Sequence, residues 1–167
     1  MPRTTLASEI SVEGTALHAG GNVCMTLSPA ASGSGIVFSR ADLGGKQIPA
    51  LYDRVGETRL GTVIAEGNVS VGVIEHLMAA IAGMGIDDMI VAVDGPELPI
   101  LDGDALSYFV LLERAGTKEQ SGLRPIIRLK RTIEFTNKNA QVRLLPSDAP
   151  QYSYDLDYSN TKAIGKQ

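Results

Sequence analysis

The sequence predicts an α+β fold in which a β-sheet is covered by helices as a two-layer sandwich, and three observations support this. Short strand-like segments separated by turns fill residues 1–72 and 124–167, and two helix-like segments lie between them. Glycine accounts for 18 of the 167 residues, which favours turns over long helices. Hydrophobic residues make up 44% and charged residues 20%, as in ordinary globular domains.

The first strands follow from alternation and turn residues. Val23, Met25 and Leu27 alternate with more polar neighbours, which predicts a strand with one covered face. Residues 62–65 and 69–73 flank a Glu-Gly-Asn turn and are predicted to form a hairpin. Cys24 lies in the first of these strands and is expected in the core, as free cysteines usually are.

A helix is predicted over residues 74–82, because apolar residues recur there at helical spacing. The stripe faces the core, and the glycines that follow can end the helix in a left-handed conformation. The four apolar residues fall at i, i+3, i+4 and i+7: Ile74, Leu77, Met78 and Ile81.

A nearly all-apolar strand and a second helix are predicted next, over residues 89–93 and 105–114. Leu106, Phe109 and Val110 are expected to face inward from this helix. An aspartate just before the helix can cap its first turn.

The remaining residues are predicted to form a linker and the beginning of a second domain. Residues 117–122 are polar and indicate a linker, so the domains are expected at 1–122 and 123–167. No helical pattern follows, and the second α+β domain is expected to be incomplete in this chain. Its strands are expected at 126–130, 132–136, 141–145 and 152–158.

Charge and composition exclude several classes of function. The formal net charge is −4 and the pI is near 5.1, so a nucleic-acid partner has no electrostatic support. A single cysteine rules out an intramolecular disulfide and indicates a reducing compartment. No apolar run is long enough to span a membrane, and the N-terminus lacks the apolar stretch of a secretory signal. We therefore expect a soluble, cytoplasmic protein.

The candidates for chemistry are few, because the chain has only two histidines, His18 and His76. His76 follows Glu75 at the start of the first predicted helix, on the side away from the apolar stripe. Small residues such as Ala79 flank it, so another domain or subunit can approach this side closely. A histidine that only faces solvent or makes a hydrogen bond fits the same pattern.

Four collinear blocks of the sequence carry a resemblance to a known family. They are Gly14-x-x-Leu17-His18-x-Gly20, residues 57–60, the helix with its Glu75-His76 pair (residues 74–87), and residues 94–105. In residues and spacing they resemble the zinc-dependent UDP-3-O-acyl-N-acetylglucosamine deacetylases of lipid A biosynthesis. The resemblance extends over essentially the whole chain.

The resemblance implies a fold, a reaction and a site. Two similar α+β domains would face each other across the active site. His76 would be a ligand of Zn²⁺ together with a histidine and an aspartate from the second domain, and Glu75 would act as general base. His18 would bind substrate. Water would hydrolyse the N-acetyl group of the UDP-linked acylated glucosamine and release acetate.

The chain also departs from the family, and these departures leave alternatives. Family members are about twice as long, and their remaining zinc ligands would lie beyond Gln167. Gly61 stands where many members have cysteine. The missing C-terminal domain or a second chain is therefore an expected partner. The alternatives are a truncated, non-catalytic remnant that binds a sugar nucleotide or a partner protein, and a purely structural subunit.

Overall fold

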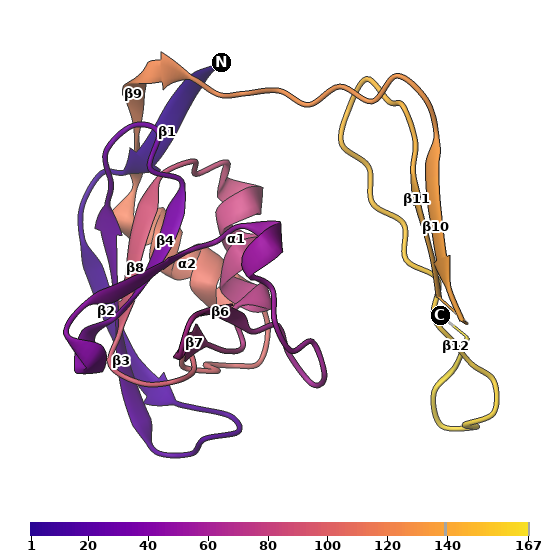
Figure 1. The fold of residues 1–167 in the computed structure, drawn as a ribbon, viewed down its shortest axis with the longest axis horizontal. Coiled ribbons are helices and arrows are strands. Elements are labelled where there is room, and N and C mark those ends of the chain that lie inside the picture. The colour runs from indigo at the N-terminus through magenta and orange to yellow at the C-terminus, as the bar shows by residue number, and fades with distance from the viewer. Residues whose placement is uncertain (139, 167) are drawn as a thin grey trace. The chain divides into compact units, whose positions relative to one another are not determined.

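A mixed five-stranded sheet and two α-helices form the first of the two units into which the chain divides, Met1–Arg124 and Pro125–Gln167. The computed structural model describes residues 1–138 and 140–166. The first unit confirms the α+β class (Figure 1).

The sheet has the order β2-β3-β8-β4-β5, with β8 in the centre. β8 runs antiparallel to β3 and parallel to β4. The all-apolar sequence of β8 fits this central position, since both of its neighbours are strands. The strands are β2 (Ile10–Thr15), β3 (Asn22–Pro29), β4 (Ile36–Arg40), β5 (Lys46–Pro49) and β8 (Met89–Val93).

The alternation predicted for β3 is confirmed. Val23, Met25 and Leu27 are buried and point to one face of the sheet. Cys24 points to the opposite face and is only half-buried, so its predicted core position is wrong. The alternation of the strand decides its exposure, because successive side chains point to opposite faces.

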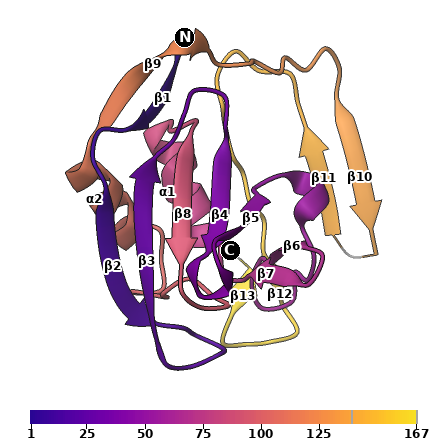
Figure 2. The ribbon, with the colours of Figure 1, turned by 60° about the vertical axis from the view of Figure 1, so that its left-hand side comes forward.

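Both helices cover the same face of the sheet (Figures 1 and 2). The first, α1 (Glu75–Met84), confirms the predicted helix; it begins one residue later and ends two residues later than predicted. Leu77 and Ile81 are buried on its sheet-facing side. Gly85 ends the helix at φ 66°, a left-handed conformation that glycine adopts at little cost.

The second helix, α2 (Leu106–Ala115), lies where it was predicted. Phe109 packs against the core as expected, but Leu106 is 65% exposed, so its predicted inward position is wrong, and the fully buried side chains are Tyr108 and Leu112. Tyr108 can be buried because its hydroxyl donates to the carbonyl of Pro99. Once this polar atom is paired, the ring packs in the core like any large aromatic side chain.

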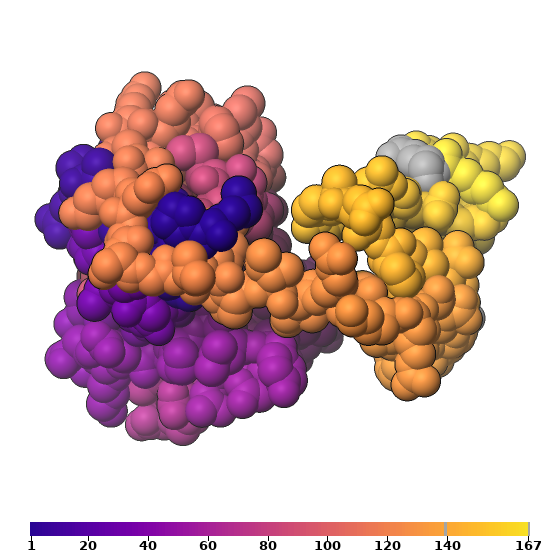
Figure 3. Space-filling model, turned by 90° about the horizontal axis from the view of Figure 1, so that it is seen from above, coloured from indigo at the N-terminus to yellow at the C-terminus, as the bar shows by residue number. Residues whose placement is uncertain are grey.

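Two further pairs of strands complete the first unit. The predicted hairpin is confirmed as β6 (Ile64–Glu66) and β7 (Val69–Val71). Residues 117–122, predicted as a linker, belong instead to the strand β9 (Thr117–Leu123), which pairs antiparallel with β1 (Pro2–Leu6). The two strands lie against each other in Figure 3. β9 is polar because it is largely exposed, and polarity alone does not separate such a strand from a linker.

In its described residues the second unit contains two hairpins. β10 (Ile133–Asn137) pairs with β11 (Ala140–Leu144), and β12 (Asp157–Tyr158) pairs with β13 (Gly165–Lys166). The strands predicted near 132–136 and 141–145 are therefore present. The strand predicted over 126–130 is absent from the described structure, and only the end of that predicted over 152–158 forms. In both segments the apolar pattern predicted a strand, but these residues do not pair with a neighbouring strand in the described structure.

Two 3₁₀ helices, Ala41–Leu43 and Tyr52–Arg54, flank β5. Within residues 1–138 and 140–166, neither helix is long and apolar enough to cross a membrane.

Candidate functional site

The four sequence blocks that carry the family resemblance meet at the N-terminal end of α1. Residues 57–62 form a loop against the first turn of this helix. His18 reaches the same loop from the turn that follows β2, and Glu97 reaches His18 from the segment after β8. Segments far apart in the sequence therefore build one site around the Glu75–His76 pair.

Glu75 is held by the backbone of this loop. Its Oε2 accepts a hydrogen bond of 2.8 Å from the N–H of Thr62, and the N–H of Ile74 donates to the Thr62 carbonyl. Gly61 lies beside the carboxylate, because a Cβ at this glycine would be 3.8 Å from Oε1 of Glu75. Glu75 is thus fixed through one oxygen, and its other oxygen remains available for chemistry.

The charge of Glu75 also affects the core. Burial raises the pKa of the Tyr108 hydroxyl, and the negative charge of Glu75 raises it further. Tyr108 therefore stays protonated and neutral at physiological pH, and its hydroxyl continues to donate a hydrogen bond to the carbonyl of Pro99.

His76 lies next to Glu75, with 3.8 Å between its Nε2 and Oε1 of Glu75. Its side chain is 27% exposed. Its Nδ1 is buried and has no hydrogen-bond partner among the described residues. A buried nitrogen of this kind normally has a partner, so the ring is set up for an interaction that these residues do not supply.

Two contacts hold His18 against the 57–62 loop and Glu97. Its backbone N–H donates to Oε2 of Glu97 at 2.9 Å. Its Nε2 lies 3.1 Å from the carbonyl oxygen of Leu60, a distance that suits donation from a protonated Nε2. In that tautomer Nδ1 carries the free electron pair and can accept a hydrogen bond.

Two of the four non-glycine residues with positive φ in the described structure lie at the site. Leu60 has φ 64° and Val73 has φ 57°, in the left-handed region that side chains other than glycine seldom adopt. Leu60 supplies the carbonyl that contacts His18, and Val73 leads directly into α1. Strain of this kind costs about 1–3 kcal/mol per residue and clusters at functional sites.

A catalytic zinc ion needs about three protein ligands and an open position for water. His76 offers a partly exposed imidazole, which fits one such ligand. Across the described parts of the chain, however, no group of three histidine, cysteine, aspartate or glutamate side chains is arranged to hold a metal. These residues fit part of a zinc site, and further ligands would have to come from elsewhere.

The sequence predicted Glu75, His76 and His18, and the structure brings all three to the same loop. Sequence reasoning missed the Leu60 carbonyl and the Thr62 N–H, because backbone groups have no signature in the sequence. The role of Glu97 was also missed. Its only signal was its place in the 94–105 block.

Comparison with known proteins adds an independent result. Residues 3–167 match the family model LpxC, described as UDP-3-O-acyl N-acetylglycosamine deacetylase. Two proteins named UDP-3-O-acyl-N-acetylglucosamine deacetylase are 40% identical over 163 residues (Myxococcus xanthus, strain DK1622) and 39% identical over 167 residues (Campylobacter lari, strain RM2100). A third, from Teredinibacter turnerae, is 38% identical over 164 residues.

These matches cover the chain and the relatives to different extents. They include 97–100% of this chain but only 52–56% of each relative. The chain thus spans about half the length of the curated relatives it matches. The family model matches nearly every residue, and the chain therefore belongs to the LpxC family of UDP-3-O-acyl N-acetylglycosamine deacetylases.

Proposed function

We propose that this chain supplies the N-terminal part of a zinc-dependent enzyme that hydrolyses the N-acetyl group of UDP-3-O-acyl-N-acetylglucosamine in lipid A biosynthesis. The products are the free amine and acetate. Residues outside this chain, in a C-terminal domain or a second chain, supply the remaining zinc ligands. Family membership and the names of the relatives support the reaction and the substrate.

One observation carries the proposal: Glu75 and His76 stand side by side at the start of α1, and their side chains are 37% and 27% exposed, so an external partner can reach both. One oxygen of Glu75 is fixed by Thr62, and the other lies 3.8 Å from Nε2 of His76. A carboxylate base beside a ligating imidazole suits metal-assisted amide hydrolysis.

Each residue of the site has a role in this proposal. Bound zinc would polarise the acetamide carbonyl and lower the pKa of water. His76 holds the metal at the start of α1. Glu75 takes a proton from the attacking water, and the Thr62 N–H keeps its carboxylate in place. His18, oriented by Leu60 and Glu97, binds the substrate through its free ring nitrogen.

We also propose that residues 123–167 are the start of a second α+β domain and that residues 1–122 form the first. The β10–β11 hairpin supports this, because its register places four apolar side chains on one face. All four are exposed by 48–66%. An apolar face of this kind needs helices to cover it, as in the first unit. The four residues are Ile133, Phe135, Val142 and Leu144.

A fusion protein tests the proposal. Residues 1–167 are joined to the part of the Myxococcus xanthus relative that this chain does not match, and bound zinc and acetate release are measured. We expect about one zinc per fusion protein and release of acetate from the UDP-linked substrate. The variant His76→Ala should lose most of the bound zinc. The control His18→Ala should keep it, since His18 is not assigned to the metal.

The same measurements can contradict the proposal. Full zinc occupancy in the His76→Ala fusion would remove His76 from the ligand set. A folded fusion that binds the UDP-sugar but contains no zinc and releases no acetate would favour a sugar-nucleotide-binding remnant instead.

A further inference from the structure

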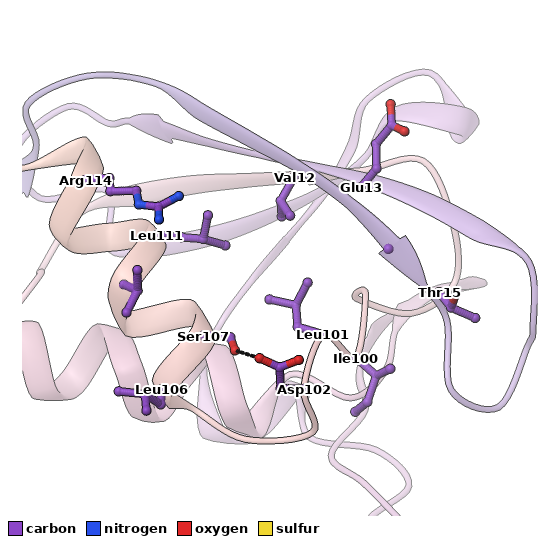
Figure 4. Close-up of a pocket in the computed structure, with 12 residues that line it drawn as sticks. Val12, Glu13, Thr15, Ile100, Leu101, Asp102, Leu106, Ser107, Leu111 and Arg114 are labelled. Atoms are coloured by element: carbon purple, nitrogen blue, oxygen red, sulfur yellow. Dashed lines mark hydrogen bonds between the residues drawn. The ribbon is translucent and has the colours of Figure 1, made fainter.

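A groove of about 620 Å³ lies on the first unit, apart from the Glu75–His76 site. It runs between β2, at the edge of the five-stranded sheet, and α2. Val12 borders it on the strand, Leu101 on the loop before α2, and Leu106 and Leu111 on the helix (Figure 4). Leu106 is 65% exposed here, and with the other three side chains it gives the groove apolar walls.

The β2 edge of this groove offers unpaired backbone groups. The carbonyl of Thr15 points away from β3, because it accepts from the N–H of Ile100. Backbone groups alternate in direction along a strand, so the N–H and C=O groups of Ser11 and Glu13 point to the same side as those of Thr15. These outward groups of Ser11 and Glu13 have no hydrogen-bond partner among residues 1–138 and 140–166.

The two edge strands of the sheet, β2 and β5, differ in whether they can pair with a further strand. β5, at the far edge, is four residues long and contains Lys46 and Pro49, which hinder the addition of another strand. β2 has neither lysine nor proline, and its register with β3 is unbroken from Ile10 to Thr15. The β2 edge is therefore open to strand addition, and the β5 edge is protected against it.

Both ends of the groove are closed, which limits what can enter. At one end Ile100 pairs with Thr15, and at the other the N–H of Ser8 donates to the carbonyl of Ala115. Five residues of β2 remain between them, which is about 17 Å of extended chain. An extended peptide of four or five residues fits this length.

The charge of Arg114 and the direction of the chain segment next to β2 indicate where the C-terminus of such a peptide lies. Arg114, in the last turn of α2, lies at the Ser8 end and makes no ion pair within the described residues (Figure 4). Asp102, at the opposite end, is occupied by a hydrogen bond from Ser107. The Pro99 segment already pairs antiparallel with the end of β2. A peptide that continues in this direction has its C-terminus at Arg114.

We infer that the groove between β2 and α2 binds an extended protein segment that adds to the sheet as a sixth strand. Its backbone pairs with Ser11 and Glu13, its alternate apolar side chains enter the groove, and its C-terminal carboxylate contacts Arg114. Peptide binding beside an exposed sheet edge is a common mode of recognition, in which main-chain bonds give affinity and side-chain pockets give specificity. The inference does not depend on the proposed deacetylase function.

Synthetic peptides test this inference on the full 167-residue chain. Fluorescein-labelled GTVTV with a free C-terminal carboxylate is titrated with the protein, and fluorescence anisotropy is measured. We expect saturable binding, weaker binding of the C-terminal amide by about two- to fivefold, and loss of binding for GTSTS, which lacks the apolar side chains. The Arg114→Gln variant should bind acid and amide equally.

A matched pair of variants tests the role of the strand edge. Glu13→Pro removes only the outward N–H and places a ring at the edge, so peptide affinity should fall by about tenfold or more. Glu13→Ala keeps the N–H and should bind as the native chain does. Circular dichroism checks that both variants fold, and if Glu13→Pro does not, the acid–amide comparison in Arg114→Gln decides.

Three results would overturn the inference. The first is equal binding of GTVTV and GTSTS, or saturable binding of neither. The second is an acid–amide difference that survives in Arg114→Gln. The third is concentration-dependent dimerisation of the chain that Glu13→Pro suppresses, which would assign this edge to a second copy of the chain.

Discussion

Replacement of Asp88 by alanine should destabilise the first unit strongly, because this carboxylate, directly before β8, joins β1 and the loop before β4 to the central strand. The side chain is fully buried. It accepts two hydrogen bonds of 2.7 Å from the guanidinium of Arg3 in β1. It also accepts bonds from the N–H groups of Gly33 and Gly35, in the loop before β4.

The magnitude follows from what the substitution leaves behind. The side chain of Arg3 is only 14% exposed, so without Asp88 its charge remains largely buried and unpaired. Breaking a buried ion pair by removing one partner costs about 3–5 kcal/mol. The N–H of Gly33 can reach water, and the N–H of Gly35 is less accessible. We therefore expect a loss of about 4 kcal/mol from a typical total of about 5–15 kcal/mol.

Urea unfolding followed by circular dichroism measures this loss. The control is Asp53→Ala, which removes an exposed carboxylate 3.7 Å from Arg54 and should change the free energy of unfolding by less than about 0.5 kcal/mol. The double variant Arg3→Met/Asp88→Ala should be more stable than Asp88→Ala alone, because no buried charge is left unpaired. If Asp88→Ala costs no more than the control, the reasoning is refuted.

The same carboxylate predicts a pH dependence. Burial alone would raise the pKa of Asp88, but the hydrogen bonds from Arg3 and from the N–H groups of Gly35 and Gly33 hold this pKa below its ordinary value of 3.8. A lowered pKa in the folded state means that Asp88 stabilises the fold above pH 3.8 and that this contribution is lost as the pH falls through the folded-state pKa. The stability difference between the native chain and Asp88→Asn should therefore shrink in strong acid.

Three further changes test other parts of the structure. Tyr108→Phe should lower the free energy of unfolding by about 1 kcal/mol, measured by urea titration, because the hydrogen bond to Pro99 is lost while the packing is kept. Gly95→Ala should cost about 1–3 kcal/mol in the same assay, since a Cβ there would lie 2.5 Å from Val23. Limited proteolysis should cut first within residues 125–132, which form no strand, and early cleavage inside the helices would contradict the division into units.

The parts of the fold that could be predicted have strong local signals. The stripe of α1 and the continuous apolar run of β8 each fit one type of element, and both lie where expected. The buried position of Tyr108 on α2 was not predicted, because its burial depends on a hydrogen bond to the carbonyl of Pro99 that the sequence does not display. β9 was missed because its pairing with β1 joins residues more than a hundred positions apart.

In the candidate site, too, some groups could be predicted from the sequence and others could not. The side chains that define it, Glu75, His76 and His18, carry chemical identity that a sequence displays. The groups that hold them are mostly main chain: the N–H of Thr62 and the carbonyl of Leu60. Any residue type could supply these groups, so their position becomes known only when the chain is folded.

The most direct test of the central claim uses the fusion protein described above with Glu75→Gln. The amide oxygen still accepts from the Thr62 N–H, so the loop and the zinc content should be unchanged. The base is lost, and the rate of acetate release should fall by about 10²–10⁴. Glu119→Ala, which removes an exposed carboxylate of β9, is the matched control and should leave the rate unchanged. Near-normal acetate release by the zinc-loaded Glu75→Gln fusion would contradict the assignment of Glu75 as the base.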